Sequence, residues 1–177
     1  MSVTYSARVA LDILFQQVIT SGNLVSGPLE GHFRELFDIT PAAGTMVAYA
    51  KSETAIGATT TVYDIIGSLS AVDGSATLSM ARVYLIAIKN RGTSATQYLT
   101  IGPDATNGFG AIAANTGFWA AALGSGGGTV VAADGYSWTV HYNKTGITAS
   151  AGSTDEVSVV TTGTGNAWDI LIIGATA

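Results

Sequence analysis

The stretch from Arg82 to Pro103 limits what this chain can fold into more than any other part of the sequence. Val83 to Ile88 is apolar at nearly every position and too short for a free helix. It is followed by Asn90-Arg91-Gly92, so it predicts a strand covered on both faces. Apolar and polar residues then alternate from Tyr98 to Ile101 and stop at Gly102-Pro103, as in a strand with one dry face. We therefore expect the two strands to form a β-hairpin near the middle of an all-β core.

Segments with the pattern of a strand follow one another along the rest of the chain. The odd positions between Ala7 and Phe15 are apolar, which favours a strand over a helix. We expect Gly31 to Thr40 to be extended and Asp73-Gly74 to mark a hairpin turn. Further strands are predicted at Met46–Ala50, Thr59–Ile66, Thr129–Ala133, Tyr136–Tyr142, Glu156–Thr162 and Trp168–Ile173. About ten short strands with glycine-marked turns predict an all-β, single-domain β-sandwich or jelly roll over residues 1–177. Residues 1–40 would be an extended N-terminal strand or arm segment, and residues 41–177 the core.

The composition bears on how the surface of such a fold is used. Hydrophobic residues make up 47% of the chain and charged residues only 11%, whereas an ordinary soluble domain has roughly 25% charge. The mean hydropathy is +0.39, and a weakly charged surface favours association. We therefore weigh a constitutive homo-oligomer or assembly component equally against a well-packed sandwich with threonine-rich outer faces.

Charge and apolar run lengths exclude several classes of partner. The net charge is −5 and the seven basic residues are scattered, so we expect no nucleic-acid partner. The absence of cysteine excludes disulfides, zinc-thiolate sites and thiol catalysis. Asp12 falls in the first apolar stretch, which argues against a signal peptide. No run approaches the roughly 20 apolar residues that span a bilayer, so we expect no membrane partner and synthesis in a cytoplasm.

Three short motifs resemble ligand or modification sites but lack necessary parts. Gly108 to Ala113 fits G-x-G-x-x-A, with Asp134 near the distance of the acidic partner, yet no βαβ unit flanks it, so we expect a structural glycine loop. Asp104 to Gly108 is oxygen-rich like part of a calcium loop but lacks its spacing and closing Glu, so we expect an Asx turn. Asn143-Lys144-Thr145 matches the glycosylation sequon and predicts only a turn.

No arrangement for acid–base or nucleophilic catalysis is visible. Asp155 and Glu156 precede a strand in which neighbouring side chains point to opposite faces, so they are not expected to share a proton. His32 and His141 are far apart in sequence and are expected at a surface or an interface. Leu123 stands where a nucleophile elbow requires its first glycine. We therefore expect no enzyme activity, no catalytic residue, no cofactor and no metal.

The aromatic residues are the candidates for a contact surface. Some alternate with other aromatics on a predicted strand, and others sit beside the glycine run Gly124–Gly128. Core packing is the leading explanation for them, followed by contact with a protein and then by stacking on a sugar. The candidate interface residues are Phe33, Phe37, Phe118, Trp119, Tyr136 and Trp138.

The order of several segments resembles a group of small virion structural proteins of tailed bacteriophages. The similar segments are Val62–Leu69, Ala81–Asn90, Leu99–Gly102 and Trp168–Gly174, and the resemblance covers about Met46 to Ala177. The group consists of single jelly-roll domains that decorate or cement the capsid, with some relatives in tails. Two departures stand out. The part before Thr40 is richer in charge and aromatics, and the run at residues 124–128 replaces a Pro-Gly turn.

The resemblance implies a non-enzymatic capsid decoration or cement protein on the virion surface. Such a chain would form trimers that contact the lattice of the major capsid protein at the junctions of its subunits. The N-terminal arm, up to about Asp38, is the segment expected to reach a neighbour. A tail or baseplate component is the alternative within the same class. A carbohydrate-binding β-sandwich module that uses Trp119 and Trp138 is the alternative from another class.

Overall fold

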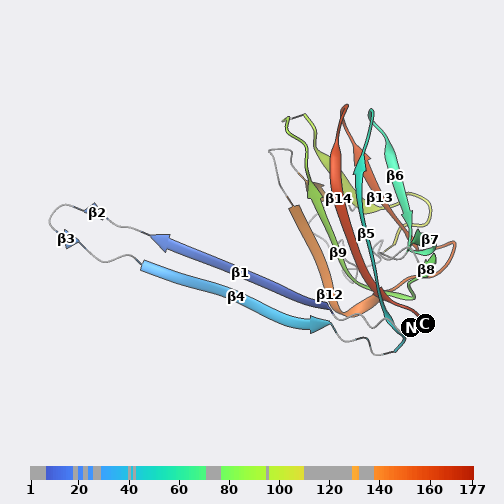
Figure 1. The fold of residues 1–177 in the computed structure, drawn as a ribbon, viewed down its shortest axis with the longest axis horizontal. Helices are drawn as coiled ribbons and strands as arrows, with labels where there is room; N and C mark the ends of the chain where they lie inside the picture. The colour runs from blue at the N-terminus through green and yellow to red at the C-terminus, as the bar shows by residue number, and fades with distance from the viewer. Residues whose placement is uncertain are drawn as a thin grey trace. The chain divides into compact units, whose positions relative to one another are not determined.

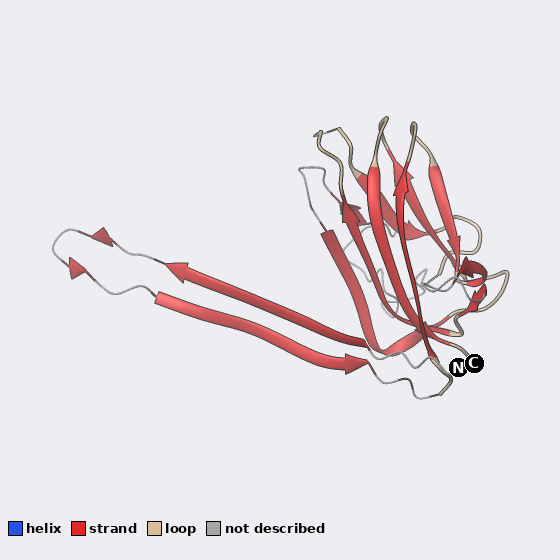
Figure 2. Ribbon diagram, in the orientation of Figure 1, coloured by secondary structure: helices blue, strands red, loops and turns tan. Residues whose placement is uncertain are grey.

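The computed structural model describes the chain except residues 1–6, 18–19, 22–23, 26–28, 40, 42, 71–76, 95, 110–128 and 132–137. The described residues contain fourteen strands and no helix (Figures 1 and 2), which confirms the all-β prediction. The strands are β1 (Ala7–Gln17), β2 (Thr20–Ser21), β3 (Leu24–Val25), β4 (Leu29–Ile39), β5 (Met46–Thr54), β6 (Thr60–Asp64), β7 (Ile66–Ser70), β8 (Thr77–Ser79), β9 (Arg82–Asn90), β10 (Leu99–Pro103), β11 (Thr129–Val131), β12 (Trp138–Thr148), β13 (Glu156–Thr161) and β14 (Ala167–Ala175).

Two antiparallel four-stranded sheets form a β-sandwich. One sheet has the order β12-β9-β14-β5 and the other β11-β10-β13-β6. The chain passes repeatedly between them, so that β5, β9, β12 and β14 lie in one sheet and β6, β10, β11 and β13 in the other (Figure 1). Each of the eight strands overlaps a range expected from alternation and β-branched content, and three of them, β5, β9 and β14, cover that range completely.

The core lies between the inner faces of the two sheets. Ile86, Ile88 and Ile172 of one sheet and Leu99 and Ile101 of the other are 1% exposed or less. They belong to one continuous cluster of buried side chains. β9 lies between two neighbours in its sheet and is buried over most of its length, so the prediction of a central strand is confirmed. The alternation predicted for β10 is also confirmed, because Leu99 and Ile101 are buried while Tyr98 is 41% exposed.

The predicted hairpin between β9 and β10 is wrong. β9 pairs with β12 and β14, whereas β10 pairs with β11 and β13 in the opposite sheet. The chain crosses the sandwich between them as an arch, in which the Asn90 side chain donates to the Gln97 carbonyl oxygen at 2.8 Å and accepts from the Gly92 N–H at 2.8 Å. Apolar alternation requires only that each strand has a dry side. Stacking across the core satisfies that requirement as well as pairing side by side does.

The hairpin predicted at Asp73-Gly74 is confirmed by its flanking strands. β7 and β8 pair antiparallel, with Ser70 opposite Thr77, although the turn itself lies outside the described residues. At the other predicted turn, in β12, the register with β9 shifts between Tyr142 and Ile147. The Asn143 side chain accepts from the Thr145 N–H at 3.0 Å within that bulge, so the turn expected at the sequon is a bulge inside a strand.

Residues Ser6–Thr40 form a second compact unit, here called the N-terminal unit, and Met1–Tyr5 with Pro41–Ala177 form the sandwich unit. In the N-terminal unit β1 and β4 pair antiparallel in unbroken register, from Ala7 opposite Ile39 to Gln17 opposite Leu29. The short strands β2 and β3 pair with each other. Both predicted N-terminal segments are therefore strands, and their pairing makes them one long hairpin.

Candidate interaction surface

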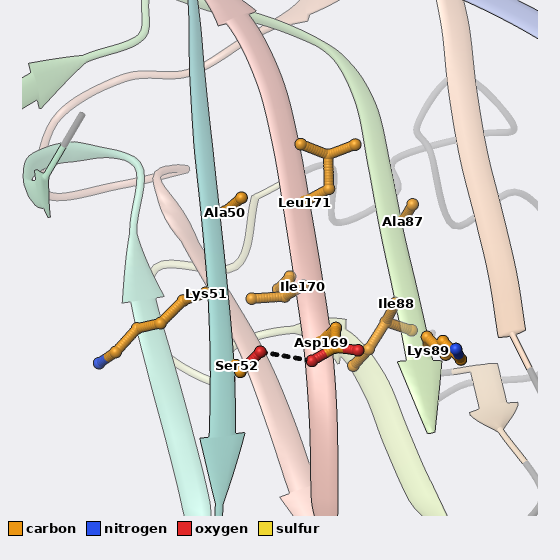
Figure 3. A pocket seen from close by; sticks show the side chains of 9 residues that line it. All are labelled: Ala50, Lys51, Ser52, Ala87, Ile88, Lys89, Asp169, Ile170 and Leu171. Atoms are coloured by element: carbon orange, nitrogen blue, oxygen red, sulfur yellow. Dashed lines mark hydrogen bonds between the residues drawn. The ribbon is translucent and has the colours of Figure 1, made fainter. Parts of the chain in front are cut away.

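The outer face of the sheet formed by β5, β14 and β9 is hollowed by a shallow depression of about 490 Å³ (Figure 3). Ala50, Leu171 and Ala87 lie opposite one another across the three strands, and Figure 3 shows them pointing to the same side. Ile170, one residue along β14, is 2% exposed and belongs to the core, so the Ala50–Leu171–Ala87 row faces outward. Leu171 between two alanines makes this part of the outer face apolar.

Polar groups line one end of this depression. The Ser52 hydroxyl donates to Asp169 Oδ1 at 2.6 Å, and Arg91 Nε lies 3.0 Å from the same oxygen. The Asp169 carboxylate therefore already has a hydroxyl donor and a cationic neighbour, and both ionic side chains are more than a third exposed. Such a pair contributes about 0–1 kcal/mol. The Arg91–Asp169 pair holds the side chains at this end of the depression in place. It supplies one carboxylate and no second one for acid–base catalysis.

The inner face of edge strand β5 ends in a charged pair. Lys51 Nζ lies 2.6 Å from Glu53 Oε1, and this hydrogen bond raises the pKa of Lys51. Next to the pair, Tyr49 and Tyr63 meet edge to face with ring centroids 5.9 Å apart. Burial raises the pKa of both phenols. β5 thus passes from a buried aromatic contact to an exposed Lys51 paired with a half-buried Glu53.

Three loops are joined by hydrogen bonds at one end of the sandwich. Gln97 Nε2 donates to the Thr164 carbonyl oxygen at 2.9 Å, and the backbones of Ala55 and Asn166 are bonded at 2.7 Å. Ile56 projects from this hydrogen-bonded rim with 91% of its surface exposed. An exposed apolar side chain at a loop tip can anchor a protein contact.

Among the described residues, the exposed large apolar side chains of the sandwich are Ile56, Val62, Tyr98, Tyr142 and Val160, each at least 38% exposed. Alternation in the sequence predicted only the exposure of Tyr98. No local signal separates an exposed valine from a buried one until the strand's neighbours are known.

The structure describes the backbone of only half of the predicted interface residues. Phe33 and Phe37 lie in β4, opposite Ile13 and Val9 of β1. Trp138 begins β12 opposite Lys89. Phe118, Trp119 and Tyr136 lie outside the described residues. The register places Phe33 and Phe37 in the N-terminal unit and Trp138 in the sandwich, so the six residues do not all belong to one unit.

The weak motifs have structural explanations where they are described. Asp104 Oδ1 accepts from the Thr106 N–H at 2.9 Å, which confirms the Asx turn. Gly108 forms an isolated bridge with Glu156, while residues 110–113 and 134 of the dinucleotide-like pattern lie outside the described residues. Asp155 is 4% exposed and its Oδ2 accepts from the Gly152 N–H at 2.7 Å, so this carboxylate holds a turn.

Two features of the described residues bear on metal and membrane partners. Within the described residues, no group of three or more His, Asp or Glu side chains is placed to hold a metal ion. No helix long and apolar enough to cross a membrane occurs in the part of the chain that the structure describes. His32 in β4 and His141 in β12 belong to different units.

Comparison of the chain with protein-family models, with curated proteins and with solved structures finds no match. What the molecule does must therefore be inferred from its own surfaces.

Proposed function

We propose that this chain is a non-enzymatic structural protein of a virion, most specifically a decoration or cement protein on the capsid of a tailed bacteriophage. Its partner would be the lattice of the major capsid protein, and it would bind there as a homotrimer after synthesis in the host cytoplasm. The segment resemblance between residues 46 and 177 motivates this proposal.

The strand order supports the jelly-roll part of the proposal. The eight sandwich strands β5, β6, β9, β10, β11, β12, β13 and β14 can be numbered one to eight in chain order. One sheet then has the strand order one-eight-three-six, and the other has the strand order two-seven-four-five. This order is the one expected when a long antiparallel ribbon is folded over into two sheets, as in jelly rolls of capsid proteins.

The main support for the proposal is the long two-stranded hairpin of the N-terminal unit. Eleven residues of β1 pair with eleven of β4, and neither strand has another partner among the described residues. One row of the register pairs Val9 with Phe37 and Ile13 with Phe33. A two-stranded sheet is marginal in water by itself and needs an apolar surface to cover it. A hairpin of this kind fits an arm that is held against a neighbouring protein in an assembly.

Mass spectrometry of purified particles would first identify the tailed phage that contains this chain. The test is then the melting temperature of DNA-free heads of that phage. We expect the full chain to raise the melting temperature of the heads. The double change Phe33→Ser with Phe37→Ser should abolish the rise, while the matched change His32→Ser, in the opposite row of β4, should leave it in place.

Heads that melt at the same temperature with and without the chain would remove the basis for cementing. A chain found only in purified tails would assign it to the tail or baseplate instead. Absence of its peptides from every purified particle fraction would overturn the virion role altogether.

A further inference from the structure

Strand β5 forms a long and regular edge of its sheet. It pairs with β14 over all nine of its residues, from Met46 opposite Ala175 to Thr54 opposite Ala167, without a register shift. No strand pairs with its other side among the described residues. β12, at the opposite edge of the same sheet, is interrupted by its bulge, and a bulge is a usual protection against edge-to-edge pairing. β5 lacks that protection.

The backbone hydrogen bonds show which groups of β5 point to the open side. Thr176 donates its N–H to the Thr45 carbonyl oxygen at 3.0 Å, and Ala55 donates to the Asn166 carbonyl oxygen at 2.7 Å. In an antiparallel pair, alternate residues direct both backbone groups to the same neighbour. The odd-numbered residues of β5 therefore face β14. The even-numbered residues, Ala50 and Ser52 among them, direct their N–H and C=O groups to the open edge.

We propose that β5 is a homotypic contact, in which it pairs antiparallel with β5 of a second copy of this chain about a two-fold axis at Ser52. The two sheets of four strands then join into one sheet across the contact. In this register Ser52 exchanges backbone hydrogen bonds with the partner's Ser52, and Ala50 does so with the partner's Thr54. Both pairs use groups that already point to the open edge.

The charges of β5 select this register among those that the backbone permits. Centring on Ser52 places Lys51 opposite the partner's Glu53, and Glu53 opposite the partner's Lys51. These are non-hydrogen-bonded positions, where facing side chains come closest. Centring on Ala50 would place Lys51 opposite Tyr49 and leave both charges without a counterpart. Centring on Lys51 would also let the even-numbered residues bond across the edge, but it would set the two Lys51 side chains opposite each other as like charges.

The side chains are placed for such a contact. Lys51 and Glu53 lie on the same face of β5 with their charged atoms 2.6 Å apart, and the side chain of Lys51 is 55% exposed. Figure 3 shows Lys51 reaching past β5 on the side away from β14. A second copy would join the two intrachain pairs into one four-charge cluster of alternating sign. This contact does not depend on the capsid role, since it joins copies in pairs wherever the chain is found.

The test is the dissociation constant of the full chain, measured by sedimentation equilibrium. We expect an even number of protomers in the wild-type assembly in solution, which for the proposed trimer means a pair of trimers. Lys51→Glu alone and Glu53→Lys alone should each weaken association by about tenfold or more, because each sets like charges opposite one another. The double variant Lys51→Glu with Glu53→Lys should restore association, because opposite charges face each other again.

A backbone variant gives an independent measurement. Ala50→Pro removes an N–H that points to the open edge, and proline is tolerated by edge strands at such positions. We expect this change to abolish the contact. The matched control is Val62→Pro in β6, the edge of the other sheet, where the Thr59–Thr161 hydrogen bond shows that even-numbered residues also face outward. It should leave association unchanged.

A chain that stays monomeric at all concentrations would overturn the proposal. So would an oligomer whose dissociation constant is unaffected by the single charge reversals, or is weakened by them and not restored by the double variant. If Ala50→Pro does not fold by circular dichroism, the charge series decides alone.

Discussion

Tyr63 and Trp168 connect the two sheets through one buried hydrogen bond. Trp168 Nε1 donates to the Tyr63 hydroxyl oxygen at 2.9 Å, from β14 of one sheet to β6 of the other. Trp168 is 1% exposed and Tyr63 is 3% exposed. Burial raises the pKa of Tyr63 because the phenolate would lose its water, and the hydrogen bond from Trp168 opposes this only in part.

The raised pKa of Tyr63 predicts a loss of stability in alkali. A phenol whose pKa is higher in the folded state contributes stability that is complete below its unfolded pKa of about 10 and is lost as pH rises toward the folded value. We expect the free energy of unfolding in urea to fall above pH 10, and to fall less steeply in Tyr63→Phe. The control Tyr98→Phe, at a side chain that is 41% exposed, should keep the wild-type slope. Equal slopes in all three proteins would contradict this assignment.

A comparison of two glycines distinguishes the cost of backbone strain from the cost of steric overlap when a side chain is added. Gly146 has φ of +72° and a Cβ placed there would lie 2.8 Å from a ring carbon of Tyr84, which is 1% exposed. Gly152 has φ of +67° but a Cβ there would meet nothing within 4 Å. Both positions disfavour a side chain for the same backbone reason, and only Gly146 adds a clash with a buried ring.

We therefore expect Gly152→Ala to cost about 1 kcal/mol and Gly146→Ala about 1–3 kcal/mol more, measured by chemical denaturation. Because the φ values are nearly the same, the difference between the two variants measures the overlap with Tyr84. Variants of equal stability would show that the Tyr84 ring moves aside without cost.

At the scale of elements, the arch between β9 and β10 depends on Asn90. This side chain is fully buried and is bonded to both arms of the turn, at the Gln97 carbonyl oxygen and the Gly92 N–H. Asn90→Ala should lower the free energy of unfolding by about 2–3 kcal/mol, because it leaves a donor and an acceptor unpaired. Thr93→Ala, at an exposed position of the same loop, should cost about 0.5 kcal/mol or less. A similar cost for both would mean that other bonds hold the arch.

At the scale of the whole molecule, the chain is a sandwich unit and an N-terminal unit with different sources of stability. The buried cluster of the sandwich is drawn from residues between Tyr49 and Ile172, and both of its sheets lie outside Ser6–Thr40. The N-terminal unit consists of paired strands without a third strand among the described residues.

Replacing residues 8–38 by a short Gly-Ser linker should therefore leave a cooperative thermal transition for the sandwich, because its core cluster is complete without them. Differential scanning calorimetry would show this transition and its enthalpy. A broad, non-cooperative transition would mean that the sandwich needs the N-terminal unit in order to fold.

The sequence by itself determined where the strands lie. Alternation and β-branched content are local properties, so Val83–Ile88, Leu99–Ile101 and Trp168–Ile173 were recognisable as strands, the first covered on both faces and the second with one dry face. Local chemistry also sufficed for the turn at Asp104, because an Asx side chain bonds to a backbone N–H two residues on.

Only the tertiary structure decided which strands pair. β9 and β10 have the same alternation whether they lie side by side or face each other across a core, and the choice is made by contacts distant in the sequence. For the same reason the sequence did not reveal the exposed Ile56, the outward row at Ala50 or the open edge of β5. Exposure and pairing depend on which strand becomes the neighbour, and a residue's own segment does not contain that information.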